Sequence, residues 1–468
     1  MFNFESEECE DYRDDSRLEA LAASLSEAGE SAYFDSDTLE EIASYHFENG
    51  RYDEALHVLD RLVSMYPYSS DGWMRRGVVL NNLGRHLEAL DAYDKVLSLN
   101  PTDIETIVNR GITLDSLDRT EEALDAFADA LELDPRNEET LFNKGVTLER
   151  LDRIPEAIAS FLKCADVAPE HPEVWYELGF CFDRIGENER SIESYDKHLD
   201  IDPYSHDAWY NRGIVLNRLE RYDAAVASYD MAIVISDEFA SAHYNRGNAL
   251  ANVNDLRGAI KSYKRVLELE GPDGATCYNI ALAYEELKQF DSAIKFFEMA
   301  VKVDDGYAEA WYGLGCCFDA IEKYETALPY FNRAIVLNPE TPDFWYAKGD
   351  CAYNLGRLDE AIKAYRTVIR VAPDNREVWM DYAETLFEGR QLEDAVNAYR
   401  SALSINPKQV KAYFQQAKAL FALGRSEESA QSLKKAFELE PGRQSEFMGA
   451  NPDLAGDSRI RSLLGLDD

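Results

Sequence analysis

The nine residues "AWYNRGIVL", at positions 208–216, place an indole, a phenol, an amide and a guanidinium group directly before a glycine. These four side chains, from Trp209 to Arg212, could form a binding site. They could also be one copy of a repeated pattern in which most of them hold a helix in place. The rest of the chain separates these interpretations, because the stretch recurs.

The chain repeats with a period of 34 residues. The pentapeptides WMRRG (73–77), WYELG (175–179), WYNRG (209–213), HYNRG (243–247), WYGLG (311–315) and WYAKG (345–349) share one register, and all six tryptophans occupy one position of it. A period of this length is typical of solenoids built from stacked helical units. Twelve units follow one another without a gap, starting at Ser36, Ser70, Ile104, Glu138, Pro172, His206, Ala240, Gly274, Ala308, Pro342, Arg376 and Val410.

Each unit carries the same marks at fixed positions. The eighth residue is glycine or alanine, the twentieth is alanine or serine, the twenty-fourth is aromatic or leucine, and the thirty-second is proline in nine units. Apolar residues between these marks return at i+3, i+4 and i+7, which predicts two short helices per unit, the second closed by proline. The small residues at positions 8 and 20 should allow the two helix backbones to approach closely. No unit buries its apolar face alone, so the units are expected to stack.

These marks resemble the tetratricopeptide repeat, whose 34 residues prefer W4, L7, G8, Y11, A20, F24, A27 and P32. The resemblance extends over about 408 of the 468 residues. It implies an all-α fold, a right-handed α-solenoid superhelix of antiparallel helix pairs. It also implies a non-catalytic scaffold for protein–protein interactions, and it says little about the partner.

Four segments make up the predicted domain organisation. Residues 1–15 are expected to be an acidic disordered tail, and residues 16–35 an N-terminal capping helix. Residues 36–443 hold the twelve units. Residues 444–468 are expected to form a C-terminal capping helix, with Ile460, Leu463 and Leu464 on the face that covers the last unit.

In the tetratricopeptide repeat family, first-helix positions 2, 5, 6, 9, 12 and 13 line the concave face. An amide side chain both donates and accepts hydrogen bonds, so a ladder of asparagines can hold a peptide backbone whatever its sequence. Such ladders are found in O-linked N-acetylglucosamine transferases and kinesin light chains, which this chain resembles at position 6. Asparagine is also common there in consensus repeats, and both interpretations stay open. The candidates are Asn109, Asn143, Asn211, Asn245 and Asn279.

Tyrosines and acids complete the predicted groove. Position 5 supplies Tyr176, Tyr210, Tyr244 and Tyr278, whose rings could contact a ligand or pack between neighbouring units. Acids at position 2 are favoured by the helix dipole alone. That explanation fails at position 12, near the helix end, where Asp183 and Glu285 stand. They predict an acidic groove for a peptide that carries lysine or arginine.

Arginine or lysine at position 7, as in Arg212, replaces the apolar residue usual in the family. We expect these cations to pair with second-helix acids such as Asp94 or Asp230. Of the four side chains in the opening stretch, Trp209 and Arg212 are therefore predicted to be structural. Asn211, and with it Tyr210, is predicted to face a ligand.

Charge and composition exclude several functions as first candidates. With 48 basic and 89 acidic residues, the formal charge is −41, which repels phosphate backbones and anionic lipid surfaces. No apolar run approaches the roughly 18 residues of a membrane span, and the N-terminus resembles no signal peptide. Seven cysteines without disulfide-like spacing fit a cytoplasmic protein. No nucleotide, zinc or nucleophile motif appears, so neither an enzyme nor a cofactor is predicted.

The sequence thus predicts a scaffold that binds an extended, basic peptide segment in its concave groove. Asn211, Asn245 and Asn279 would hold the peptide backbone, while Tyr210, Tyr244, Asp183 and Glu285 would select its side chains. The alternative is a regulatory or assembly subunit that acts through its convex face or its ends, including by self-association.

Overall fold

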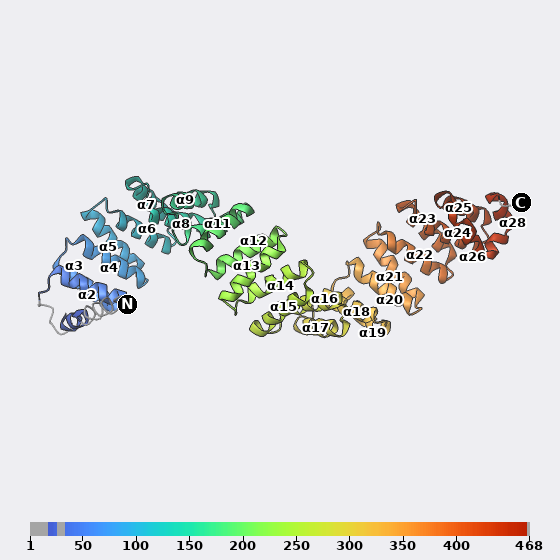
Figure 1. Cartoon of the computed structure of the whole chain (residues 1–468), viewed down its shortest axis with the longest axis horizontal. Coiled ribbons are helices and arrows are strands. Elements are labelled where there is room, and N and C mark those ends of the chain that lie inside the picture. The colour runs from blue at the N-terminus through green and yellow to red at the C-terminus, as the bar shows by residue number, and fades with distance from the viewer. Residues whose placement is uncertain (1–16, 26–32, 466–468) are drawn as a thin grey trace, which may run out of the picture. The chain divides into compact units, whose positions relative to one another are not determined.

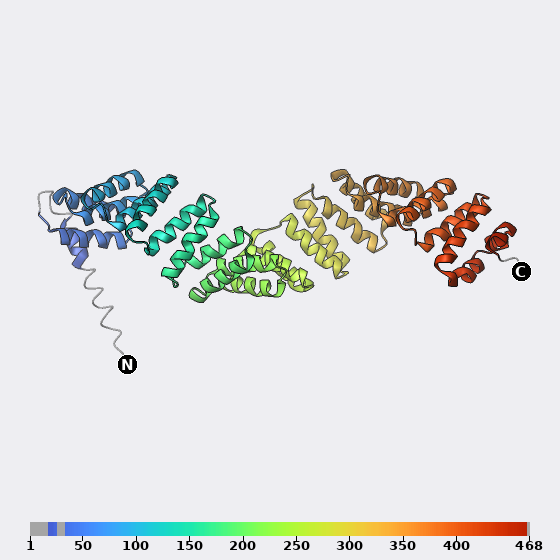
Figure 2. The same ribbon diagram turned by 90° about the horizontal axis from the view of Figure 1, so that it is seen from above.

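The computed structural model describes residues 17–25 and 33–465, and over these residues the chain is helical without a strand. The predicted acidic tail at residues 1–15 lies outside the described residues. The chain divides into two compact units, Met1–Ile235 and Ser236–Asp468. Within each, helices follow one another in antiparallel pairs (Figures 1 and 2). This arrangement confirms the predicted all-α solenoid.

The first compact unit begins with a helix at residues 17–25 and continues with six helix pairs. Each first helix packs on its second helix, which in turn packs on the first helix of the next pair. The pairs are α2 (Ser36–Glu48) and α3 (Tyr52–Met65), α4 (Ser70–Asn82) and α5 (His86–Leu99), α6 (Ile104–Ser116) and α7 (Thr120–Leu133), α8 (Glu138–Arg150) and α9 (Ile154–Val167), α10 (Val174–Arg184) and α11 (Asn188–Ile201), and α12 (His206–Arg218) and α13 (Tyr222–Ile235).

The second compact unit has the same order of packing and ends in three short helices. Its pairs are α14 (Ala240–Asn252) and α15 (Leu256–Glu270), α16 (Gly274–Glu286) and α17 (Phe290–Val303), α18 (Ala308–Ala320) and α19 (Tyr324–Leu337), α20 (Pro342–Asn354) and α21 (Leu358–Val371), α22 (Arg376–Glu388) and α23 (Leu392–Ile405), and α24 (Val410–Ala422) and α25 (Ser426–Leu439). A 3-10 turn, η1 (Pro441–Arg443), leads to α26 (Gln444–Ala450), α27 (Pro452–Gly456) and α28 (Ser458–Leu464).

The turn inside each pair contains one residue in the left-handed backbone conformation, always at position 15 of the 34. Its φ lies between 57° and 78°. Only glycine adopts this region without a steric cost, yet seven of these residues are not glycine. The varied residue type explains why the repeat pattern does not reveal the position. The residues are Gly50, Gly84, Asp118, Asp152, Gly186, Glu220, Asn254, Lys288, Glu322, Gly356, Arg390 and Gly424.

The glycine at position 8 makes room for the aromatic ring at position 24. A Cβ atom on Gly77 would lie 2.3 Å from Cε1 of Tyr93, and one on Gly213 would lie 2.6 Å from Cε1 of Tyr229. Both rings are only 1% exposed. The predicted reason for a small residue, close approach of two helix backbones, is therefore incomplete. The space is occupied by one edge of the ring, formed by Cδ1, Cε1 and Cζ.

The tryptophan at position 4 ties one pair to the next. Its indole Nε1 donates to the carbonyl oxygen of the residue six positions earlier, in the turn that closes the preceding pair. For Trp209 this acceptor is Pro203, at 3.0 Å. All six tryptophans make the bond, at 2.8 to 3.0 Å: Trp73, Trp175, Trp209, Trp311, Trp345 and Trp379.

Arginine at position 7 pairs with an acid on the preceding second helix. Arg212 lies 2.6 Å from Asp196 and also donates to Ser228, and Arg110 lies 2.9 Å from Asp94. These pairs, with Arg76–Asp60, confirm the predicted ion pair for three of the position-7 cations, Arg76, Arg110 and Arg212.

Both ends of the described chain cover an apolar surface. Leu25, in the helix at residues 17–25, is buried with the residues of α2 and α3. At the other end Ile460 is fully buried against α25, and Leu464 packs beside it. The prediction for Leu463 is wrong, because its side chain is 54% exposed.

The C-terminal segment is also not a single helix. Helix α26 ends at Ala450, before Pro452, which has no backbone N–H and restricts the residue that precedes it. Helix α28 has only seven residues. Its two turns direct only Ile460 and Leu464, four residues apart, towards α25, and this leaves Leu463 facing solvent.

We expect Gly213→Ala to destabilise the protein by about 1–3 kcal/mol, because the added methyl group overpacks the site against Tyr229. Thermal and urea unfolding of the full chain, followed by helical circular dichroism, measure the change. Gly449→Ala, in α26, is the matched control, since no atom lies within 4 Å of a Cβ placed there. Equal unfolding midpoints for the two variants would contradict the packing explanation.

Candidate peptide-binding face

The predicted groove residues all lie on first helices and are half-buried. Asn109, Asn143 and Asn211 stand on α6, α8 and α12 of the first compact unit. Asn245 and Asn279 stand on α14 and α16 of the second. The row of amides is interrupted within the first compact unit, where Glu177 of α10 takes the same position.

Two of the asparagines are hydrogen-bonded to a tyrosine of the preceding first helix. Asn211 Nδ2 donates to the hydroxyl of Tyr176 at 3.0 Å, and Asn279 Nδ2 donates to the hydroxyl of Tyr244 at 3.1 Å. Asn143 instead donates to the backbone carbonyl of Glu139, in its own helix, at 2.9 Å. A primary amide has two N–H donors and a carbonyl acceptor, so each asparagine keeps groups for a ligand backbone.

The rings of the position-5 tyrosines pack within the solenoid. The Tyr176 ring lies 5.8 Å from that of Tyr195, and the Tyr210 ring lies 6.0 Å from that of Tyr229. The same contact recurs in the second compact unit, where Tyr244 packs on Tyr263 and Tyr278 on Phe297. The rings are therefore structural, and their hydroxyl groups remain the part available to the predicted groove.

Two of the three acids at position 12 of the first compact unit, Asp115 and Asp183, are neutralised by the next first helix. Asp115 and Arg150 form an ion pair at 2.5 Å, and Asp183 and Arg218 form another at 2.5 Å. In each case the arginine stands at position 13 of the following pair. Asp183, predicted to select a basic ligand side chain, is thus already held by a cation of the chain.

A pair of carboxyl groups shares the face between α8 and α10. Burial of Glu177, together with the charge of and hydrogen bond to Glu149, raises the pKa of Glu177 to about 8. Near neutral pH the pair therefore carries a proton. The sequence did not reveal this pair, because Glu149 and Glu177 belong to different 34-residue units. The sequence of one unit does not show which side chain of the next unit lies beside it.

The second compact unit keeps acidic groups on this face without such compensation. Burial raises the pKa of Glu285, on α16, and of Asp319, on α18. Asp350, on α20, has its pKa raised to about 6 by burial and by Asp381 and Asp319, although the hydroxyl of Tyr365 donates to it. Among the described residues Glu285, Asp319 and Asp350 have no ion-pair partner. These are desolvated carboxyl groups on three successive first helices.

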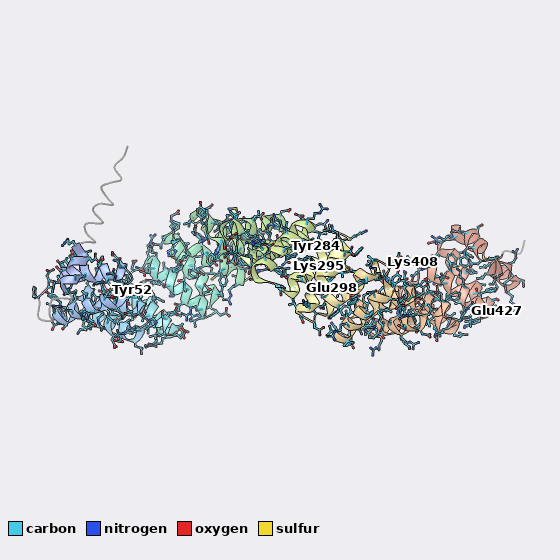
Figure 3. All side chains as sticks on the ribbon, turned by 90° about the horizontal axis from the view of Figure 1, so that it is seen from below. Tyr52, Tyr284, Lys295, Glu298, Lys408 and Glu427 are labelled. Carbon is cyan, nitrogen blue, oxygen red and sulfur yellow. The ribbon has the colours of Figure 1, made fainter. Side chains whose placement is uncertain are left out.

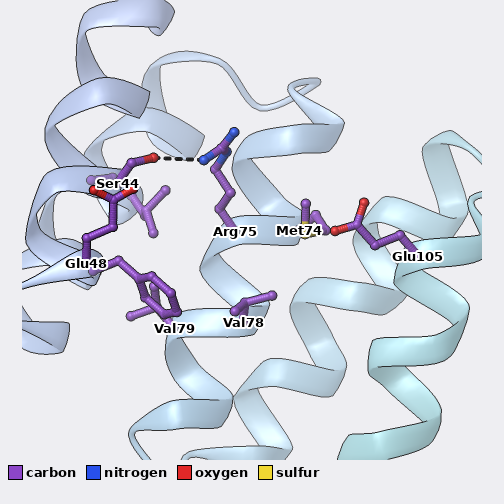
Figure 4. Close-up of a pocket in the computed structure, with 10 residues that line it drawn as sticks. Ser44, Glu48, Met74, Arg75, Val78, Val79 and Glu105 are labelled. Atoms are coloured by element: carbon purple, nitrogen blue, oxygen red, sulfur yellow. Dashed lines mark hydrogen bonds between the residues drawn. The ribbon is translucent and has the colours of Figure 1, made fainter. Parts of the chain in front are cut away.

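Face positions of the first three pairs line a cavity of about 300 Å³ (Figure 4). Its walls include Phe47, Met74 and Val78, and Glu105 stands on the far side from Glu48. Arg75 is fixed there, because its Nη1 donates to Ser44 Oγ at 2.9 Å and its Nε lies 2.8 Å from Asp71. The sequence analysis did not single out this cavity, since only the stacked pairs bring its walls together.

Reactive groups are not assembled in the described part of the chain. Burial raises the pKa of the Cys164 thiol to about 11 and those of Cys181 and Cys316 to about 12, so these thiols are protonated at neutral pH. No group of three histidine, cysteine or carboxylate side chains is placed to hold a metal ion among residues 17–25 and 33–465. Of the helices described, none is both long and apolar enough for a membrane crossing.

Family models match most of the helix pairs. Two models of the tetratricopeptide repeat match residues 41–104, 108–166 and 205–243, and residues 172–205. A third, the C-terminal domain of cilia and flagella-associated protein 70, matches residues 226–451. No curated protein matches the chain.

Solved structures with similar folds are repeat proteins. YrrB, a TPR protein with an unusual peptide-binding site, is 27% identical and covers 39% of this chain and 95% of its own, with a TM-score of 0.36. MamA is 30% identical and covers 35% of this chain and 96% of its own, with a TM-score of 0.33. The C-terminal part of a TPR repeat-containing protein from Cytophaga hutchinsonii is 13% identical and covers 51% and 98%, with a TM-score of 0.46.

We expect Glu177→Gln to stabilise the protein increasingly as the pH rises. In the folded chain the pKa of Glu177 is about 8, whereas in an unfolded chain it is about 4.3. Because the folded state favours the neutral carboxyl group, the free energy of unfolding of the wild-type protein falls as the pH rises from about 4.3 to about 8. The glutamine variant cannot ionise and keeps its stability over this range. The gain should reach about 2 kcal/mol at pH 9 and be small at pH 5. Thermal unfolding across this range measures it.

The control for this experiment is Glu193→Gln, which removes the same charge from an exposed site on α11. A gain that is independent of pH, or equal in both variants, would show that Glu177 titrates as an ordinary surface carboxyl group.

Proposed function

This chain belongs to the tetratricopeptide repeat family, and we propose that it holds an extended, basic peptide segment along the first helices of its pairs. Members of the family are typically non-catalytic scaffolds for protein interaction. We extend that description to this chain, which would bind its partner without transforming it and without a cofactor.

The buried carboxyl groups of the second compact unit carry this proposal. Glu285, Asp319 and Asp350 are desolvated, and their pKa values are raised because no cation offsets their burial. A lysine or arginine side chain of a ligand would supply the missing opposite charge. The successive first helices α16, α18 and α20 would present these groups to an extended chain one after another.

Asn279 stands on the same helix as Glu285 and completes the arrangement. One of its N–H groups is given to Tyr244, which fixes the amide and leaves its carbonyl oxygen and second N–H for a peptide backbone. We assign the selection of basic side chains to Glu285, Asp319 and Asp350 rather than to Asp183, because Arg218 already holds Asp183. Asn245, on α14, would continue the backbone contacts within the second compact unit, and Asn211, on α12, would make the same kind of contact within the first.

The overall charge favours a basic protein partner over nucleic acid or an anionic membrane surface. A formal charge of −41 attracts cationic segments at long range and speeds their association. We place this binding in the cytoplasm, which suits a chain with seven cysteines and no disulfide-like spacing.

We expect the variant Glu285→Gln, Asp319→Asn, Asp350→Asn to weaken binding of a basic probe at least tenfold. The probe is a fluorescein-labelled nonapeptide of alternating lysine and alanine, and fluorescence anisotropy in low salt measures its affinity for the full chain. The control variant, Asp291→Asn, Glu298→Gln, Asp359→Asn, removes the same charge from exposed second-helix sites. If both variants lose the same amount of affinity, the effect comes from the overall charge of the chain, and the first-helix face is not the binding site.

Binding of the same probe should also strengthen as the pH rises from 5 to 7. The pKa of Asp350 is about 6, so its carboxyl group gains the negative charge that a cationic ligand requires over this range. The probe should in turn lower that pKa and release protons on binding, which isothermal titration calorimetry in buffers of different ionisation enthalpy detects. An affinity that does not change with pH would argue against contact with Asp350.

A further inference from the structure

The contact between position 7 of a first helix and position 25 of the preceding second helix is an ion pair at three of the five such junctions in the first compact unit. Position 7 is an arginine and position 25 an aspartate in three pairs: Arg76–Asp60 at 2.7 Å, Arg110–Asp94 at 2.9 Å and Arg212–Asp196 at 2.6 Å. We call this contact the outer junction, because neither position belongs to the peptide-binding face. Three outer junctions of this unit are each closed by one ion pair. The other two have Ala128 and Lys144, or Leu162 and Leu178, at these positions.

In the second compact unit the charge at position 25 reverses. Four of the six pairs have a cation there: Lys264, Arg366, Arg400 and Lys434. The exceptions are Asn332 and Glu298, which projects from α17 (Figure 3). The residues at position 7 do not supply a matching acid. Arg366 donates from Nε and Nη2 to the hydroxyl oxygen of Tyr382, both at 3.3 Å. At the next outer junction, Arg400 and Gln416 line the same cavity.

The junction between Arg400 and Gln416 is open rather than closed. A cavity of about 630 Å³ lies among α23, α24 and α25, and Tyr413, Leu403 and Leu420 form its apolar wall. Gln416 also lines the cavity but is only 6% exposed. Its Oε1 accepts from Ser432 Oγ at 2.9 Å, and its amide N–H groups have no partner among the described residues.

Three cations surround the cavity, and two of them are engaged. Arg400 lies 3.0 Å from Glu428, and Lys435 lies 2.8 Å from Glu438. Lys434 forms no ion pair with any residue in the described ranges, and its side chain is exposed. The cavity therefore combines an excess positive charge, the amide N–H groups of Gln416 and an apolar wall. These features fit a peptide segment in which an acidic residue stands next to an aromatic residue.

The chain itself contains one segment of this composition. Residues 1–15, "MFNFESEECEDYRDD", carry seven acids against one arginine, together with Phe2, Phe4 and Tyr12. We propose that the cavity among α23, α24 and α25 binds residues 1–15 of a second copy of the chain. Carboxylates of the segment would pair with Lys434 and accept from the Gln416 amide, while an aromatic ring would lie on Tyr413 and the two leucines.

This contact joins two different surfaces, so it is heterologous. After the first contact forms, one copy still offers a free cavity and the other a free segment, so association would continue head to tail. It is independent of the peptide-binding face, because it uses positions 7 and 25 and a ligand of opposite charge. Failure of one proposal therefore leaves the other intact.

A peptide of residues 1–15, labelled with fluorescein and carrying Cys9→Ser, tests the contact directly. We expect it to bind the full wild-type chain saturably in the micromolar range and to bind Arg400→Glu, Lys434→Glu at least tenfold more weakly. Both side chains are exposed, so the variant should keep its helical circular dichroism. The control variant, Lys363→Glu, Arg370→Glu, makes the same charge change on exposed sites of α21 and should bind like wild type.

Sedimentation velocity of the full chain supplies the second measurement. The sedimentation coefficient of wild type should rise with concentration, and the rise should vanish both in Arg400→Glu, Lys434→Glu and in a variant with Glu5, Glu7, Glu8 and Glu10 changed to glutamine. Binding of the lysine–alanine nonapeptide should not weaken in the cavity variant. A wild-type chain that stays monomeric, a peptide that does not bind at 1 mM, or association that the cavity variant leaves unchanged would each overturn the proposal.

Discussion

The contact of an aromatic ring with a glycine sets the packing in eight of the twelve helix pairs. At Gly77 and Gly213 the ring of the second helix lies where a Cβ atom would be, so the two helices of a pair can dock in only one rotation and at one height. That docking buries the ring almost fully and fixes which residues of the first helix face outward. Close-packed contacts of this kind tolerate little change in volume. The regularity of the pairs follows from the repetition of this one fit.

Once the ring and glycine fix each pair, the outward positions are free to vary in chemistry. The structure uses them in two ways. In the first compact unit, acids such as Asp183 form ion pairs with arginines of the next first helix. In the second, Glu285 and Asp350 stay buried without a cation. The same fold therefore presents neutralised acids such as Asp183 and desolvated acids such as Glu285, and only the latter favour a cationic ligand.

The outer junctions show the same principle on the other side of the helices. An arginine and an aspartate close the junction at Arg212, and exchanging the acid for a cation opens one at Arg400. A solenoid accepts such exchanges because its core does not depend on surface ion pairs, which contribute little to stability. Binding chemistry can thus change from pair to pair while the packing stays constant.

The sequence by itself determined the helix pairs, their register and the structural roles of Trp209 and Arg212. The reason is that the contacts behind them recur every 34 residues and involve neighbours close in the chain. Position 15 escaped notice because a left-handed turn here accepts many residue types. The state of each polar group was decided only by the tertiary structure. Whether Asp183 is paired, Glu177 is protonated or Leu463 is exposed depends on which side chain the adjoining helix brings within a few ångströms and on how much water it excludes.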